Sequence, residues 1–371
     1  MLIGVPKEIK NHEYRVGLTP ESVTELVEDG NQVLVETEAG MGIGASDEVY
    51  RAHGAEIVMS AKDIFARADM IIKVKEPQAV ERALLRKGQV LFTYLHLAAD
   101  RAQTDDLLKS GAVCIAYETV TDDDGDLPLL KPMSQVAGRL SIQVGAAALQ
   151  KNAGGRGVLL GGVPGVAPAN VLIIGGGDVG FNAAQMAVGL EAHVTILERD
   201  NAVMERLSAY FGAKARIIRS TPALLSELLK TADMVVGAVL VPGAAAPKLI
   251  TRDMLKTMQA GSVLVDVAID QGGCFETSHP TTHDDPTYEV DEIIHYCVAN
   301  MPGAVARTST YALNAATLTH AKRIARLGWE GALSQDPHLL NGLNVCEGHL
   351  TYQAVGDALG LETRASRDLV S

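Results

Sequence analysis

The chain has 371 residues, more than one hydrophobic core usually holds, so two domains are expected. Its formal net charge of −13 argues against a nucleic-acid partner, because phosphate binding needs a basic face. The N-terminal run MLIGVPKEIK has no long apolar stretch of the signal-peptide type, and the apolar stretch 157–177 contains prolines and many glycines, unlike a transmembrane helix. Four scattered cysteines without a CxxC pair favour free thiols in a reducing compartment. We therefore expect a soluble, cytoplasmic protein with no membrane partner.

Short apolar runs alternate with helix-like stretches along most of the chain. Runs that are apolar on both faces are typical of buried parallel strands, which need crossover helices between them. An acidic, turn-rich stretch before a long helical pattern predicts a hinge near 128–134, and the tail from 306 reads as helical. We predict an α/β protein with two doubly wound, Rossmann-like domains, one formed by 1–128 and the tail 306–371, the other by 129–305. The expected strands are 2–5, 32–36, 70–74, 90–95 and 113–117, then 170–174, 193–198, 234–239, 262–268 and 295–299.

A dinucleotide fingerprint lies in the second half of the chain. The run VLIIGGGDVG places Gly175, Gly177 and Gly180 in a G-x-G-x-x-G pattern between a strand and a helix. The first glycine permits the turn, the second lets the backbone approach a pyrophosphate, and the third lets helix and strand pack closely. Glu198 ends the following strand, where an acid can hold the adenosine ribose. Its carboxylate would repel a 2′-phosphate, which favours NAD over NADP.

Four polar residues follow predicted strands, where ligands of parallel sheets bind. They are Arg15, Lys75, His96 and Asp270. Two cations can hold a substrate carboxylate, and an imidazole and a carboxylate can move protons. Each residue alone has a simpler explanation as a solvated charge, a hydrogen-bonded structural histidine or a turn former. Their joint placement favours a site for oxidising an amino acid.

Metal binding is not expected. His279 and His283 have zinc-like helical spacing, but Pro280 and the polar run TTHDDP predict a loop there. The acidic run 122–126 lacks the later glutamate of a calcium-binding loop, so a solvated turn is favoured.

Several long runs resemble one family. The start GVPKEIKNHEYRVGLTP is similar to the N-terminal signature shared by alanine dehydrogenases and the soluble part of nicotinamide nucleotide transhydrogenases. The runs GAVLVPGAAAPKLI, VLVDVAIDQGGCFETSHPTTHDDP and YCVANMPGAVARTSTYAL resemble the alanine dehydrogenase branch of that family. The resemblance implies reversible, NAD-dependent deamination of L-alanine to pyruvate and ammonia. It also implies a homohexamer in which the N-terminal segment and the tail form the substrate domain.

The resemblance also assigns roles to residues. It implies that Arg15 and Lys75 bind the substrate carboxylate and that His96 and Asp270 form the catalytic acid/base pair. Two departures stand out, because Glu198 replaces the family's usual aspartate, and Val203 replaces a basic residue whose contact Arg199 or Arg206 would have to supply. The implied nucleotide contacts, beyond the fingerprint glycines and Glu198, are Ser134, Asp178, Val179, Ser220, Val239, Leu240, Val267, Ala268, Ile269, Asp270, Ala299, Asn300, Met301 and Pro302.

Two other functions remain open at this point. One is the NAD(H)-binding component of a transhydrogenase, which works beside membrane segments. The other is a non-catalytic NAD(H) sensor, which would not need the two cations and the acid/base pair.

Overall fold

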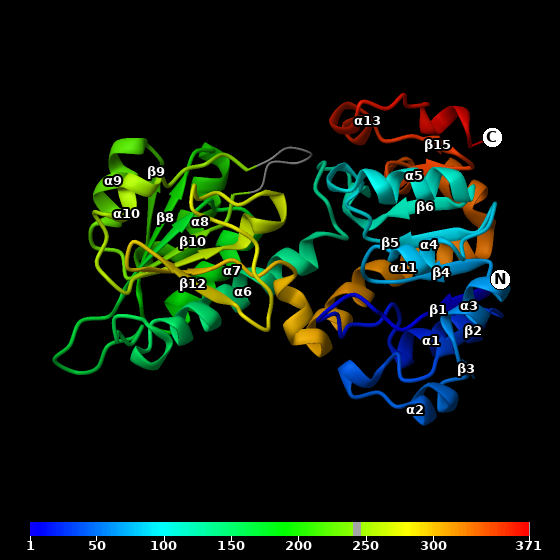
Figure 1. The fold of residues 1–371 in the computed structure, drawn as a ribbon, viewed down its shortest axis with the longest axis horizontal. Helices are drawn as coiled ribbons and strands as arrows, with labels where there is room; N and C mark the ends of the chain where they lie inside the picture. The colour runs from blue at the N-terminus through cyan, green and yellow to red at the C-terminus, as the bar shows by residue number, and fades with distance from the viewer. Residues whose placement is uncertain (240–245, 371) are drawn as a thin grey trace. The chain divides into compact units, whose positions relative to one another are not determined.

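The computed structural model describes residues 1–239 and 246–370. The chain divides into two compact units. The first comprises Met1–Met133 together with the segment from Gly303 onward, and the second is Ser134–Pro302. In Figure 1 the first unit carries the blue and cyan strands with the orange and red C-terminal elements, and the second is mainly green and yellow. Each unit holds one sheet with interleaved helices, which confirms the predicted α/β class with two doubly wound sheets.

The sheet of the first unit has the strand order β15-β14-β6-β5-β4-β1-β2-β3. Strands β1 to β6 are parallel, so their carboxyl ends lie along one edge. The strands are β1 (Leu2–Val5), β2 (Gln32–Glu36), β3 (Glu56–Val58), β4 (Met70–Ile72), β5 (Val90–Thr93), β6 (Val113–Ala116), β14 (Leu343–Cys346) and β15 (His349–Leu350). The helices are α1 (Pro20–Glu28), α2 (Asp47–Ala52), α3 (Ala61–Arg67), α4 (Ala79–Arg82), α5 (Arg101–Ser110), α11 (Ala306–Ser334), α12 (Pro337–Leu340) and α13 (Gln353–Leu359).

The C-terminal tail is not purely helical, which corrects the prediction. It begins with the long helix α11, but β14 and β15 then extend the first sheet in antiparallel pairing. The strand β14 is a short, fully buried run, with Val345 opposite Cys114 of β6. Glu347 and Gly348 between the strands have φ angles of 47° and 93°, the positive values that a two-residue hairpin turn requires.

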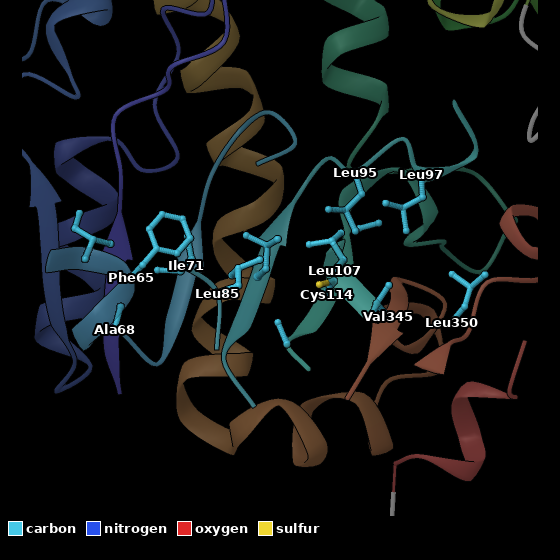
Figure 2. Packing of buried hydrophobic residues seen from close by; sticks show 14 of the residues in the cluster. Phe65, Ala68, Ile71, Leu85, Leu95, Leu97, Leu107, Cys114, Val345 and Leu350 are labelled. Carbon is cyan, nitrogen blue, oxygen red and sulfur yellow. The ribbon is translucent and has the colours of Figure 1, made fainter. Parts of the chain in front are cut away.

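The core of the first unit packs side chains from segments far apart in the chain. Phe65 of α3, Ile71 of β4 and Cys114 of β6 are fully buried, and Val345 of the tail joins the same cluster. Figure 2 shows these side chains on one side of the sheet. Burial of this apolar surface attaches the tail to the N-terminal segment and holds the strand ends in place.

The second unit has the strand order β12-β13-β11-β10-β7-β8-β9, in which only β12 is antiparallel to its neighbour among the described residues. Its carboxyl edge therefore gathers the loops that follow six strands. The strands are β7 (Asn170–Ile174), β8 (His193–Glu198), β9 (Ala215–Arg219), β10 (Met234–Gly237), β11 (Val263–Asp266), β12 (Thr287–Val290) and β13 (Ile293–Tyr296). The helices are α7 (Asp178–Gly189), α8 (Asn201–Phe211), α9 (Pro222–Leu229) and α10 (Arg252–Leu255), while α6 (Lys131–Ala148) begins in the first unit and continues into the second.

Candidate active site

The glycine loop between β7 and α7 has the geometry of a phosphate cradle. Gly175 has a φ of 100°, and a Cβ there would lie 2.6 Å from the carbonyl oxygen of Ala238. A Cβ on Gly180 would lie 1.8 Å from the carbonyl oxygen of Gly175, so helix and strand approach as closely as only glycine allows. A Cβ on Gly177, the N-cap of α7, would meet no atom of the described residues within 4 Å. The described backbone therefore leaves Gly177 uncovered at the helix N-terminus, the position at which phosphate groups bind in such folds.

Glu198 at the end of β8 folds back onto this loop. Its Oε2 accepts a hydrogen bond of 2.6 Å from the backbone nitrogen of Gly176, and its Oε1 accepts one of 3.0 Å from Asp200. The longer side chain thus reaches the fingerprint directly. Val203 in α8 is not basic, but Arg206, one turn further on, donates a 3.3 Å hydrogen bond to the carbonyl oxygen of Gly176. Arg206 therefore places a cation at the loop.

Most of the other residues expected to contact the nucleotide follow strands of the same sheet. Ser220 comes after β9, and its backbone nitrogen donates to the carbonyl oxygen of Glu198 at 2.7 Å. Val239 follows β10, the segment 267–270 follows β11, and 299–302 follows β13. Asp178 and Val179 begin α7, and Ser134 lies in α6. Leu240 lies outside the described residues.

Asp270 lies in a short 3-10 helix, Val267–Gln271, and is exposed to solvent. Asp266, the last residue of β11, is fully buried and holds the loop around Asp270 through hydrogen bonds. Asp266 accepts hydrogen bonds from the backbone nitrogens of Ala268 (3.1 Å) and Cys274 (2.9 Å) and from the Ser278 hydroxyl (2.6 Å). Burial raises the pKa of Asp266, and the hydrogen bonds from Ser278 and Cys274 oppose that rise. Asp266 therefore fixes the loop that presents Asp270.

In the first unit, Arg15 is buried with a carboxylate partner. Its Nε donates to Oε1 of Glu13 at 2.7 Å, and the same oxygen accepts from the Arg15 backbone nitrogen at 3.0 Å. Burial acts to lower the pKa of Arg15, but hydrogen bonding and charge attraction from Glu13 raise it overall. Another guanidinium nitrogen lies 3.0 Å from the sulfur of Met133. The guanidinium is therefore charged and oriented before any ligand arrives.

Lys75 follows β4 and is 8% exposed. Its backbone is fixed, since its carbonyl oxygen accepts from the Thr93 hydroxyl at 3.0 Å. Within residues 1–239 and 246–370, no hydrogen bond or ion pair engages its ammonium. Nearly buried charges are normally paired, so this one points to an anionic ligand.

His96 follows β5 and is oriented by two neighbours. Its φ of 52° lies in the left-handed region, which non-glycine residues keep only where their surroundings hold them. Glu118 accepts from the backbone nitrogens of Leu95 at 3.0 Å and His96 at 2.6 Å, and lies 3.8 Å from Nδ1 of the ring. The ring stacks on Tyr94 at 5.7 Å between centroids, with 7° between the planes. The imidazole remains 43% exposed and can reach a ligand.

Arg15, Lys75 and His96 thus lie in the segments that follow three neighbouring parallel strands, β1, β4 and β5. Asp270 and the fingerprint belong to the edge of the other sheet. Sequence reasoning missed the residues that hold these groups, namely Glu118 and Asp266. Glu118 comes two residues after β6, so the same search for polar residues behind strands would have found it.

A glycine loop at a helix N-terminus in one α/β unit, with two buried cations and a histidine in the strand loops of the other, is the arrangement of a two-domain, dinucleotide-dependent oxidoreductase. A family model described as the alanine dehydrogenase/PNT N-terminal domain matches residues 4–137, and the corresponding C-terminal domain model matches 141–353. The chain belongs to this alanine dehydrogenase/PNT family.

Individual relatives are similar over the whole length. An alanine dehydrogenase of Halomonas elongata is 58% identical and is covered completely, as is this chain. One from Mycolicibacterium smegmatis is 53% identical over 97% of each chain. A solved structure titled L-alanine dehydrogenase matches with a TM-score of 0.94 and 51% identity, covering 97% of this chain and 99% of its own.

Proposed function

We propose that this chain catalyses the reversible, NAD-dependent deamination of L-alanine to pyruvate and ammonia. The observation that carries the proposal is Lys75, a nearly buried cation whose ammonium has no hydrogen bond or ion pair among the described residues. It follows β4, the strand between β1 and β5, which precede Arg15 and His96 in the chain. We assign the substrate role to residues 1–128 with the tail 306–371, and NAD binding to 129–305. A homohexamer in the cytoplasm completes the proposal; four free, buried cysteines are in keeping with a reducing compartment.

NAD fits the residues present. The N-terminus of α7 would bind the pyrophosphate. The Glu198 carboxylate, at the end of β8 beside the glycine loop, would accept hydrogen bonds from the hydroxyls of the adenosine ribose. Ser134, Ser220, Val239 and the segments 267–270 and 299–302 would complete the site, with Leu240 as a further proposed contact. When bound, NAD supplies the acceptor for the hydride that leaves the substrate Cα.

The side chains then have distinct tasks. Arg15 and Lys75 bind the substrate carboxylate and fix the orientation of Cα. Loss of the hydride and of an amine proton converts alanine to an imine, and water adds to its carbon. His96 and Asp270 take up and return the protons of water and amine as the carbinolamine collapses to pyruvate and ammonia. The two cations stabilise negative charge throughout.

Cofactor choice should depend on Glu198. Wild-type protein should strongly prefer NAD, because the carboxylate would face a 2′-phosphate. Glu198→Ala should narrow the preference, and Arg206 beside the same loop would then attract the phosphate. The measurement is kcat/KM for both cofactors in wild type, in Glu198→Ala and in the exposed control Glu205→Gln. Equal use of NAD and NADP by the wild type would contradict this role.

Lys75→Met should raise the KM for alanine and pyruvate by about a hundredfold, the order lost when a charged hydrogen bond to substrate is removed. NADH binding, followed by fluorescence, should not change, because the nucleotide residues belong to the other unit. Unaltered alanine kinetics would show that the lysine does not contact substrate.

The test of the overall proposal is an absorbance assay of the purified chain with NAD and L-alanine. Formation of NADH with no other protein present is the expected result. A transhydrogenase component would instead need a partner and a second nucleotide, and a sensor would bind NADH without turnover. Within the described residues, no helix has the length and apolarity to cross a membrane.

A further inference from the structure

A buried group of charges lies directly behind the proposed substrate cations. Lys73, the residue after β4, is fully buried, and its ammonium lies 3.1 Å from Oε2 of Glu8 and 2.7 Å from Oε1 of Glu81. The other oxygen of Glu8 accepts from the backbone nitrogens of Val74 at 2.7 Å and Lys75 at 3.4 Å. One lysine thus serves two carboxylates, and one of these touches the backbone of Lys75.

Four carboxylates near the substrate cations are each ion-paired with a cation other than Lys75. Glu13 is engaged by Arg15, and Glu76, beside Lys75 in the chain, is ion-paired with Lys10. Glu8 and Glu81 share Lys73. The charge of Lys75 helps to lower the pKa of Glu76, but among the residues that the structure describes its ammonium forms no hydrogen bond and no ion pair within 4 Å.

We propose that Lys73 is a positioning residue for substrate binding: by holding Glu8 and Glu81, it keeps the ammonium of Lys75 available to the substrate carboxylate. The inference rests on the proposed role of Lys75. Lys73 itself is fully buried and contacts no ligand in this account.

The physical reason is the cost of leaving a buried carboxylate uncompensated. Burial already raises the pKa of Glu8, and Lys73 opposes that rise. Without Lys73, Glu8 and Glu81 must either take up protons or attract another cation, and Lys75 is the neighbouring cation that has no ion pair among the described residues. A lysine side chain is long and flexible, so it can turn to Glu8, whose carboxylate already touches its backbone. Burial acts to lower the pKa of Lys73, but the two carboxylates raise it overall, so the lysine stays charged.

The experiment compares Lys73→Met, Glu8→Gln and the double variant Lys73→Met/Glu8→Gln. The double variant removes one positive and one negative charge, so the local net charge stays that of the wild type, and glutamine can still accept from Val74. Lys75→Met serves as the reference for loss of substrate binding. Lys230→Met, which breaks an exposed ion pair with Glu227, controls for loss of any lysine.

Lys73→Met should raise the KM for alanine by about tenfold or more while NADH binds normally, because the substrate must compete with Glu8 for Lys75. The double variant should return KM to within about threefold of the wild type, which loss of packing alone would not do. In Glu8→Gln the KM for alanine should equal the wild-type value or lie below it. This variant tests the inference even if Lys73→Met does not fold.

The outcomes distinguish the role of Lys73 from that of Lys75. A normal KM in Lys73→Met, a raised KM that Glu8→Gln does not rescue, or a raised KM in Glu8→Gln alone would overturn the inference. If Lys75→Met raised the KM for alanine but Lys73→Met did not, the proposed function would stand and the inference about Lys73 would fail. If Lys75→Met had no effect, the role of Lys75 itself would be withdrawn.

Discussion

His96→Ala should slow alanine turnover by about 10²–10⁴-fold, the usual effect of removing a positioned acid or base. The imidazole is held by the ring of Tyr94 and by Glu118 beneath its backbone, yet it remains 43% exposed. That arrangement keeps the ring oriented while leaving it open to substrate, as proton transfer requires. Steady-state kinetics in both directions would measure the loss, with NADH binding followed by fluorescence.

The matched control is His349→Ala, which removes an exposed histidine of the same unit on β15. Its turnover should equal that of the wild type. Adding imidazole to the medium should restore part of the activity of His96→Ala if the loss is one of proton transfer. Near-normal turnover in His96→Ala would remove His96 from the proposed pair.

Asp270→Asn should lower turnover by a similar factor of about 10²–10⁴. The amide keeps the size of the side chain but cannot accept a proton. Folding should not suffer, because Asp270 is exposed and the loop is held by the hydrogen bonds to Asp266 instead. NADH should still bind, although Asp270 lies in one of the proposed contact segments.

Asp253→Asn provides the comparison, since it replaces an exposed aspartate in the same unit that pairs with Lys256. It should have no effect on turnover. If Asp270→Asn also turned over alanine at the wild-type rate, the proton-transfer role would pass to water or to another residue.

The positions of most parallel strands could be predicted from the sequence because they depend on local features, although several strands end one to two residues earlier than predicted. A buried parallel strand is apolar on both faces, so charged residues are expected beyond it; Lys75 and Asp270 lie three and four residues after β4 and β11. The glycine spacing was equally informative, since Gly175 and Gly180 meet backbone atoms that leave no room for a side chain.

Other features depend on contacts between distant segments or on atypical residues. The ion pairs of Lys73 connect it to Glu81, in the next helix, and to Glu8, far away in the sequence, and sequence spacing alone does not bring these residues together. The strand β9 was not predicted, because its sequence ARIIR is not apolar on both faces. It lies at the edge of the sheet and is partly exposed, so charged residues are tolerated there. The turn before β13 uses Asp291 and Glu292 at positive φ without glycine, so the hairpin was missed and β13 was placed too late.

The central claim is that this chain alone transfers the hydride of alanine to NAD. The most direct measurement uses L-alanine deuterated at Cα, with the purified chain and NAD, and analyses all products. We expect deuterium in the nicotinamide ring of NADH, together with pyruvate and ammonia in equal amounts. NADH without deuterium, or no NADH in the absence of another protein, would contradict the account.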